Sequence, residues 1–553
     1  MSDAPEFKES VYSTVCPGCN FGCGVYMRAL TAKSVDAILS IDFKKPSPVN
    51  EGKLCRFGVN LASFYTPAIS KANGKTAGKA ADNKAAIEKA AEVLKKTDAS
   101  KVCFLSVGNT TNEEHLAFMN AAKALDLPVN TGMTGLFKDI GKLHAYTGRG
   151  TTYDDVENAK KIYIFVDPYV QYPLMVRRLV HAKSKGAEIL TFGVKEFPIS
   201  TKHVFLKPTE SLYDVKEFAP DADSVVISDL TPYTQAKRLA EMIEIAGENV
   251  KMLFLKPFAN STGAGYLSKH TKQKSFDDIL DGIESGDIKV LVCLDSDLID
   301  ICLDENIAET LKNLDCLIVF ASRQTSVCEA ADIVIATEPF YKKKGSVMNA
   351  EGRLLQTTAA AGDLPLTGFN ALSDLAAALG GSSLDFDAVH TEAVTELGAT
   401  EDEFKILPPV LKKEKPPIEK ISDTLPMFDL EDHTAAPEES AADLSEEEKE
   451  KALHVYVTNP FLWNNVVDDD DFIEICRCTV TSSKLIKGYT AGVTCHCGEA
   501  TKTTRFKVSP MMCRCLLSTR KQPFSKAIVT EVTVKRTPTK PNEPEIVKEC
   551  SLN

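Results

Sequence analysis

The sequence has no excess of positive charge. It contains 64 lysine and arginine residues against 77 aspartate and glutamate residues, so its formal net charge is −13. Nucleic-acid binding needs a basic face that neutralises phosphates. The acidic balance therefore argues against nucleic acid as the main partner.

The chain also lacks long apolar runs. No stretch approaches the ~18 apolar residues of a membrane-spanning helix. The first residues, MSDAPEFKES, lack the basic start, the apolar run and the twin-arginine pair of an export signal. We therefore expect a cytoplasmic protein with no direct membrane span. In a reducing compartment its 16 cysteines are expected to be metal ligands or buried thiols rather than disulfides.

Changes in composition divide the 553 residues into four parts. Residues 1–65 are rich in Cys, Gly and Pro, which indicates a small domain ordered by a metal centre. Residues 66–405 alternate amphipathic helices such as AAIEKAAEVLKK with short apolar strands such as KVCFLSVG. Residues 406–452 are predicted to be a charged, Pro-rich linker, and residues 453–553 a β-rich domain of short β-branched strands.

Short apolar strands between helices are typical of a parallel sheet that is covered on both faces. We therefore predict an α/β fold. A small N-terminal, cysteine-rich iron–sulfur domain lies on a doubly wound parallel α/β body, and a small β-rich domain follows at the C-terminus.

The strongest motif in the sequence is a set of four cysteines. The segment VCPGCNFGCGVYM, followed by GKLCRFGVN, gives the spacing C-x2-C-x3-C-x31-C at Cys16, Cys19, Cys23 and Cys55. Three thiolates in one loop can surround one side of a cubane cluster, and a remote fourth closes it. Zinc sites usually present two separated pairs of ligands. The spacing favours a 4Fe-4S cluster, with structural zinc as the alternative.

At these residues the sequence resembles the N-terminal iron–sulfur domain of molybdopterin oxidoreductases. This superfamily includes formate dehydrogenases and the large iron–sulfur subunit of complex I. The segment IYIFVDPYVQYPLMVRRLVHAKSKG resembles part of the family's α/β body, with matches at Asp167, Pro168 and Pro173. The segment EAADIVIATEPFYKKKGSVMNAEGRLLQ resembles another part, with matches at Gly345, Asn349, Glu351, Gly352 and Arg353.

The resemblance implies cofactors as well as a fold. Catalytic relatives hold two pterin dinucleotides around molybdenum or tungsten, and a basic residue just after the fourth cysteine lies between cluster and pterin. Arg56 occupies that place. We expect Arg56, Asn349 and Arg353 to be cofactor-binding residues; for Arg353 the alternative is a salt bridge to a neighbouring carboxylate.

Several motifs of the catalytic relatives are missing. The metal ligand expected beyond the fourth cysteine has no cysteine counterpart in VNTGMTGLFKDIGKLHAYTGRG. Gly193 and Val194 stand where an acidic residue and a proline should follow a strand, and Thr209 stands where a glycine should follow Pro208. The family's dinucleotide-capping domain is not recognisable after residue 454. A bis-molybdopterin guanine dinucleotide site is therefore doubtful, and no catalytic residue is assigned.

These features predict an iron–sulfur electron-transfer subunit of a multi-subunit oxidoreductase. The expected partners are other redox subunits, either ferredoxin-like or flavoproteins. Two alternatives remain open. One is a catalytic molybdenum or tungsten bis-pterin oxidoreductase similar to formate dehydrogenase, and the other is a structural subunit whose cluster stabilises the fold.

The C-terminal domain carries a second group of cysteines. Alternate residues of a strand share one face, so a C-x-C pair can present two thiolates together. These pairs are candidates for a second metal centre; the alternative is reduced thiols without a ligand role. The three pairs are Cys476 and Cys478, Cys495 and Cys497, and Cys513 and Cys515.

From residue 477 to 553 the chain has 14 Lys or Arg and 5 Asp or Glu. This basic tail is a candidate for docking an acidic partner, and the alternative is a solvated surface without a partner.

Overall fold

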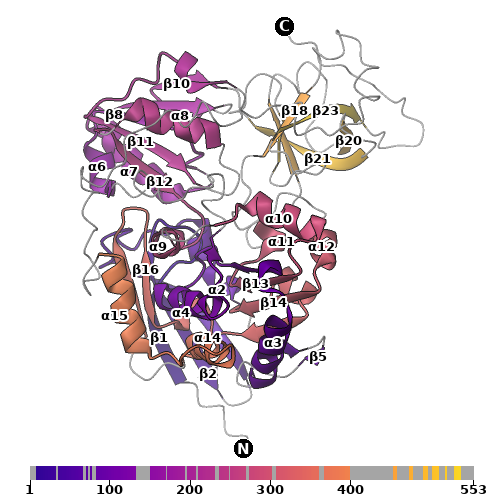
Figure 1. Cartoon of the computed structure of the whole chain (residues 1–553). Helices are drawn as coiled ribbons and strands as arrows, with labels where there is room; N and C mark the ends of the chain where they lie inside the picture. Colours follow the sequence, from indigo (N-terminus) through magenta and orange to yellow (C-terminus); the bar gives the residue numbers. More distant parts are fainter. Residues whose placement is uncertain are drawn as a thin grey trace, which may run out of the picture.

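The computed structural model describes residues 8–398 with short gaps, and six strands between residues 453 and 536. The predicted linker of residues 406–452 lies outside the described residues. The described strands form three sheets and a closed barrel (Figure 1). The gaps before residue 398 are residues 33–34, 66–69, 73–74, 77–82, 132–149, 170, 194–195, 207–209, 231–235, 248, 269–272, 302–306 and 360–365.

The cysteine-rich domain is built on an antiparallel sheet with the strand order β16-β17-β1-β2-β3. The residues between β1 and β2 contain the first three cysteines, and β17 pairs with β1 through Tyr12 and Ala359. A hairpin from far along the chain therefore completes this sheet. Its elements are β1 (Lys8–Val15), β2 (Gly24–Ala32), β3 (Val35–Phe43), α1 (Arg56–Val59), α2 (Leu61–Phe64), β16 (Gly345–Met348) and β17 (Leu354–Ala359).

The large sheet has the order β5-β4-β15-β14-β13-β6-β7, and its strands from β15 to β7 are parallel. Alternate residues of each strand enter different cores, so that Phe104 packs under α4 while its neighbour Cys103 packs on the other face. This alternation explains why the strands are apolar throughout. The strands are β4 (Lys71–Ala72), β5 (Lys75–Thr76), β6 (Val102–Leu105), β7 (Val129–Asn130), β13 (Val290–Leu294), β14 (Cys316–Ala321) and β15 (Ile333–Ala336).

Helices cover both faces of the large sheet (Figure 1). On one face lie α3 (Lys84–Lys96), α4 (Asn112–Lys123), α14 (Thr367–Ala378) and α15 (Phe386–Glu396). On the other lie α10 (Phe276–Ser285), α11 (Leu298–Ile301), α12 (Ile307–Thr310) and α13 (Ser326–Ala330).

A smaller parallel sheet is inserted between β7 and β13 of the large one, with the order β10-β9-β8-β11-β12. Helices α6 and α7 cover one face, and α8 covers the other. The elements are α6 (Tyr153–Asn158), β8 (Lys161–Ile164), α7 (Pro173–Ser184), β9 (Glu188–Gly193), β10 (Lys202–Phe205), β11 (Ser224–Asp229), α8 (Ala236–Ala246), β12 (Lys251–Leu255) and α9 (Ser261–Leu267).

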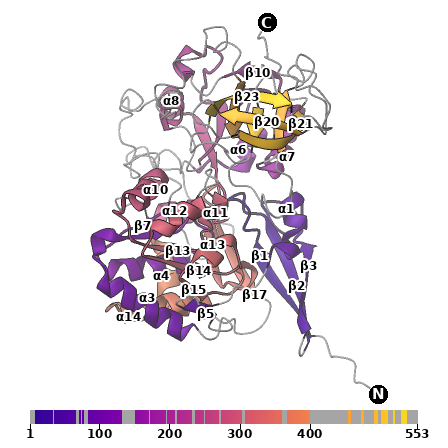
Figure 2. The same cartoon turned by 90° about the vertical axis from the view of Figure 1, so that its right-hand side faces the viewer.

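The cysteine-rich domain packs on the α6 and α7 face of the small sheet. Phe21 and Phe57 of that domain share one hydrophobic core with Tyr153 of α6 and with Met175 and Leu179 of α7. Figure 2 shows α1 at the end of the β1 to β3 sheet that faces α6 and α7. The cysteine loop is therefore held between its own sheet and these two helices.

Local sequence fixes how α6 and α7 begin. Thr152 and Asp155 form a capping box at the start of α6, in which each side chain bonds the backbone N–H of the other residue. Helix α7 begins with Pro173, whose fixed φ suits the first helical position. Its buried positions are 175, 178, 179 and 182, which is the spacing of one helix face. One of these buried positions is Arg178.

The C-terminal strands close into a barrel in the order β18-β22-β19-β21-β20-β23. The α/β fold with parallel sheets and the β-rich character of this last part are confirmed. None of the described helices has both the length and the apolar composition needed to cross a bilayer. The barrel strands are β18 (Leu453–Val457), β19 (Phe472–Cys476), β20 (Thr490–Cys495), β21 (Thr501–Ser509), β22 (Leu517–Thr519) and β23 (Val529–Arg536).

Candidate metal centre

The first three cysteines lie on the loop that joins β1 to β2. Cys16 directly follows β1 and Cys23 directly precedes β2, and the backbone N–H of Cys16 donates a 2.8 Å hydrogen bond to the Cys23 carbonyl. Gly22 has a φ of +86°, and a Cβ there would lie 2.7 Å from the side chains of Asn349 and Leu355. Glycine is therefore needed at position 22 for conformation and for space.

The fourth cysteine, Cys55, lies at the N-terminus of the short helix α1. Burial raises the pKa of its thiol, and the backbone N–H groups of Phe57 and Gly58 near the sulfur partly offset this rise. Backbone amides of Gly18 and Phe21 act in the same way on Cys16 and Cys19. N–H groups directed at sulfur commonly surround iron–sulfur centres in proteins.

All four cysteines line one cavity. The other walls include Phe21, Phe57 and Tyr172, so the cavity is apolar apart from its sulfurs. Among the described residues no three His, Cys, Asp or Glu side chains converge closely enough to hold a single metal ion. Four thiols around one apolar volume fit a cluster better than one zinc ion.

The thiols raise one another's pKa. Burial raises the pKa of Cys16 and Cys23 well above the ordinary value and that of Cys19 to about 12, and the neighbouring cysteines add to the effect. Metal ligation needs thiolates, so binding must release protons and overcome this cost. The site is therefore suited to a strongly bound, positively charged group.

The cysteine loop is tied to the small sheet through Asn20. Its side-chain oxygen accepts a 2.7 Å hydrogen bond from the backbone N–H of Lys256, and its amide donates to the Phe254 carbonyl and the Thr262 hydroxyl at 3.2 Å each. Cys19 forms an isolated bridge with Pro257. The loop therefore cannot shift without breaking contacts with the end of β12.

Asn349, one of the predicted cofactor residues, lies directly behind the cysteine loop. Its amide donates to the Phe21 carbonyl at 3.3 Å and to the Glu351 carboxylate at 3.2 Å, while its oxygen accepts from the backbone N–H groups of Glu351 and Arg353. The Arg353 side chain forms a 3.2 Å salt bridge with Glu351. These contacts hold the loop in shape; cofactor contacts by Asn349 and Arg353 stay predictions.

Arg56 directly follows Cys55, at the start of α1. Its side chain is exposed at the start of α1 and is not part of the cysteine cavity, whereas the next residue, Phe57, is 1% exposed and lines the cavity. Phe57 thus fills the space beside the four thiols. A cofactor role for Arg56 stays a prediction.

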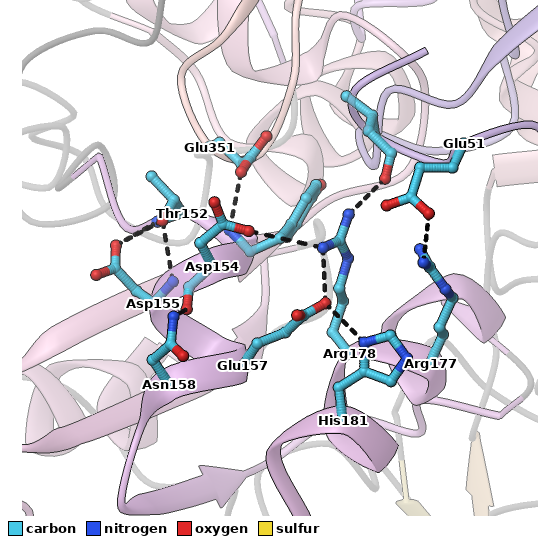
Figure 3. A network of polar contacts seen from close by, with 12 residues as sticks. Glu51, Thr152, Asp154, Asp155, Glu157, Asn158, Arg177, Arg178, His181 and Glu351 are labelled. Atoms are coloured by element: carbon cyan, nitrogen blue, oxygen red, sulfur yellow. Dashed lines mark hydrogen bonds and ion pairs between the residues drawn. The ribbon is translucent and has the colours of Figure 1, made fainter. Parts of the chain in front are cut away.

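A buried cation that packs against this domain is Arg178 of α7 (Figure 3). It donates 2.7 Å hydrogen bonds to the Glu157 carboxylate and to the Val49 carbonyl, and its guanidinium lies 5.5 Å from the centre of the Tyr153 ring. The sequence patterns alone did not single out this residue. The available signal was an arginine at a core position of an amphipathic helix, flanked by buried Leu179 and Met175.

A second cavity lies at the carboxyl ends of β13 and β14, where parallel sheets bind ligands. In the described part of the chain the Tyr65 hydroxyl and the Asn109 side-chain oxygen are buried there without a hydrogen-bond partner. Asp295 also lines it and is paired with Lys343 at 3.2 Å. Pro17, next to Cys16, forms part of the wall. A polar group bound here would thus adjoin the cysteine loop, and these side chains fit part of a pterin dinucleotide.

Other predicted features fall outside the described residues. They include the segment 132–149, which belongs to the region where the resemblance implies a metal ligand beyond the fourth cysteine. They also include positions 194 and 209. Of the six C-terminal cysteines, the structure describes only the backbone of Cys476 and Cys495, at the ends of β19 and β20. A second metal centre stays a prediction.

Comparison with known families agrees with this geometry. Residues 9–65 match the family described as the molybdopterin oxidoreductase Fe4S4 domain, and residues 231–366 match the molybdopterin oxidoreductase family. An iron–sulfur domain of this type, packed on a two-sheet α/β body, defines the class. Residues 9–65 and 231–366 of the chain are thus related to the molybdopterin oxidoreductase superfamily.

Two curated relatives illustrate the range of the superfamily. The chain is 29% identical over 199 residues to the F420-dependent formate dehydrogenase 1 subunit alpha of Methanococcus maripaludis, a match that covers 34% of this chain and 28% of that protein. It is 30% identical over 116 residues to an NADH-quinone oxidoreductase subunit of Buchnera aphidicola, covering 21% of this chain and 12% of that protein. Each match therefore spans less than a third of the relative.

Among solved structures, acetylene hydratase from Pelobacter acetylenicus has the same fold. The TM-score is 0.65 with 12% sequence identity, and the match covers 93% of this chain and 92% of that one. At this identity the likeness concerns the fold alone.

Proposed function

We propose that the chain is an iron–sulfur electron-transfer subunit of a multi-subunit oxidoreductase. Cys16, Cys19, Cys23 and Cys55 would hold its cluster. The observation that carries the proposal is that these four thiols line one apolar cavity, with backbone amides near the sulfurs of Cys16, Cys19 and Cys55. A bound 4Fe-4S cluster supplies reversible one-electron transfer.

The protein residues around the cavity have clear tasks in such a role. Phe21, Phe57 and Tyr172 exclude water from the cluster, which protects it from hydrolysis. Cys19 and Cys55 are only partly buried, whereas Cys16 and Cys23 are 6% and 7% exposed. Electrons would therefore enter or leave on the side of Cys19 and Cys55, where partner subunits such as a ferredoxin-like protein or a flavoprotein would dock.

A second function is favoured by one observation, the polar cavity beside Pro17. If a molybdenum or tungsten pterin cofactor binds there, the chain is a catalytic oxidoreductase similar to formate dehydrogenase. Tyr65, Asn109 and Asp295 would then hold polar groups of the cofactor. The proposal of an electron-transfer subunit without its own pterin rests on the motifs that the sequence lacks.

Metal analysis of the full chain, purified anaerobically, distinguishes these functions. An electron-transfer subunit should contain iron and acid-labile sulfide in equal amounts and only traces of molybdenum and tungsten. Stoichiometric molybdenum or tungsten would establish the catalytic alternative. A cluster that no low-potential reductant reduces would favour a structural subunit.

A further inference from the structure

We propose that the buried ion pair of Arg178 and Glu157 sets the reduction potential of the cluster, with Arg178 as its positive inner end. The inference rests on the proposed function, because it concerns the cluster that the four cysteines would hold. It assigns a positioning role in electron transfer to two residues outside the cysteine domain.

The charged side chains around Arg178 differ in their exposure to solvent. The side chain of Arg178 is 6% exposed and that of Glu157 is 14% exposed. Asp154, at 3.8 Å from the guanidinium, is 84% exposed, and His181, at 3.2 Å from Glu157, is 43% exposed. Of these four side chains that of Arg178 is the most buried, and the two carboxylates that pair with it are more exposed.

Two short paths connect Arg178 to the cysteine loop. On the first, its guanidinium lies over Tyr153, whose ring stacks on Phe21 at 4.2 Å between centroids and whose hydroxyl donates to the Phe21 carbonyl at 2.8 Å. Phe21 lies between Cys19 and Cys23. The ring pair thus places apolar, weakly screening material between the cation and the loop.

On the second path, Arg178 donates to the Val49 carbonyl at 2.7 Å. The next residue, Asn50, accepts a 2.9 Å hydrogen bond from the backbone N–H of Gly24 and donates to the Gly24 carbonyl at 3.1 Å. Gly24 follows Cys23 directly.

The electrostatic consequence has a definite sign. Reduction adds one electron and therefore one negative charge to the cluster, with no bond formed or broken. A fixed cation at the inner end of an ion pair stabilises the reduced state, because low-dielectric surroundings screen it little. Glu157 carries the opposite charge and opposes this effect. Removing the charge of Arg178 should therefore lower the midpoint potential, and removing the charge of Glu157 should raise it.

Potentiometric titration followed by electron paramagnetic resonance tests the proposal on the full chain. In Arg178→Gln we expect the ratio of reduced to oxidised cluster at a fixed potential to fall about threefold, which is about 30 mV for one electron. In Glu157→Gln the ratio should rise. Arg178→Lys keeps the charge and should restore most of the wild-type value.

Arg177→Gln is the matched control. Arg177 neighbours Arg178 on the same helix, but its guanidinium is paired with Glu51 at 2.6 Å and is more exposed (Figure 3). Its removal should leave the midpoint unchanged. Iron content is measured for every variant, so that a variant without its cluster is recognised.

The outcomes separate this inference from the proposed function. Wild-type protein without a reducible cluster would refute the proposed function itself. A normal wild-type cluster combined with unshifted midpoints in Arg178→Gln and Glu157→Gln would overturn this inference alone. A shift of the same sign in both variants would also overturn it, since loss of structure moves both alike. If Arg178→Gln loses its iron, the midpoint potentials of the other two variants decide. A raised midpoint in Glu157→Gln with a nearly wild-type midpoint in Arg178→Lys supports the inference, and an unshifted or lowered midpoint in Glu157→Gln overturns it.

Discussion

The Tyr153 hydroxyl donates a 2.8 Å hydrogen bond to the backbone carbonyl of Phe21, and the two rings stack with centroids 4.2 Å apart. Tyr153 belongs to α6, and Phe21 belongs to the loop that carries three of the cysteines. The contact therefore joins the small sheet's helices to the candidate cluster site.

Replacing Tyr153 with Phe removes this hydrogen bond and keeps the stack. The Phe21 carbonyl retains its 3.3 Å bond from Asn349, so the expected cost is about 1 kcal/mol. We predict that iron is lost faster in the presence of a chelator, measured by the decay of the cluster's visible absorbance. Tyr163→Phe is the control, since that hydroxyl bonds the Ala219 carbonyl at 2.7 Å in the small sheet. Equal rates of iron loss in both variants would contradict this account.

Replacing Cys19 with Ser should remove most of the cluster and loosen the cysteine domain, while the α/β body stays folded. Iron content and limited proteolysis measure both effects. Cys103→Ser provides a comparison, because Cys103 is a buried thiol of β6 whose sulfur accepts a hydrogen bond from Asn130. It should retain its iron. Full iron and unchanged protection of the N-terminal segment in Cys19→Ser would remove Cys19 from the ligand set.

Replacing Arg56 with Ala tests the role that the family resemblance implies. A guanidinium beside the cluster would stabilise the reduced state, so its loss should lower the midpoint potential. Because the Arg56 side chain is exposed, solvent should screen it, and we predict a smaller shift than in Arg178→Gln. A larger shift in Arg56→Ala, measured in the same redox titration, would show that Arg56 rather than Arg178 is the main cation.

His115 of α4 should make the α/β body sensitive to acid. Complete burial lowers the pKa of this histidine from about 6.5 to about 3, and its ring nitrogens contact the Ser106 and Ser268 hydroxyls at 3.0 and 2.9 Å. Between about pH 3 and pH 6.5, His115 therefore carries a proton in the unfolded chain but not in the folded chain. The stabilisation is complete above about pH 6.5 and falls by about 1.4 kcal/mol per pH unit below it.

Urea unfolding followed by circular dichroism at pH 7 and pH 5 measures this effect. The wild-type protein should lose about 2 kcal/mol more than His115→Gln over that interval. Parallel losses in the two proteins would show that His115 does not cause the acid sensitivity.

Local patterns predicted much of the molecule. The spacing of Cys16, Cys19 and Cys23 predicted a metal-binding loop, because three candidate ligands in one loop are a local property. The helix AAIEKAAEVLKK and the strand KVCFLSVG correspond to α3 and β6 for a similar reason, since periodicity alone distinguishes them.

Long-range pairing was not readable in this way. No local signal showed that β17 completes the sheet of β1, or that β8 to β12 form a sheet separate from β6 and β13. The burial of Arg178 depends on Val49 and Glu157, which are 129 and 21 residues away in the sequence. These two distant residues compensate the buried charge of Arg178, and helix periodicity carries no information about them.

The most direct test of the central claim is an electron count on the full chain, purified anaerobically and titrated with a low-potential reductant. Electron paramagnetic resonance and iron analysis are recorded on the same samples. The account predicts uptake of one electron per iron–sulfur cluster, with a paramagnetic signal that appears on reduction and disappears on reoxidation. Zinc in place of iron, or a chain that takes up no electron, would contradict it.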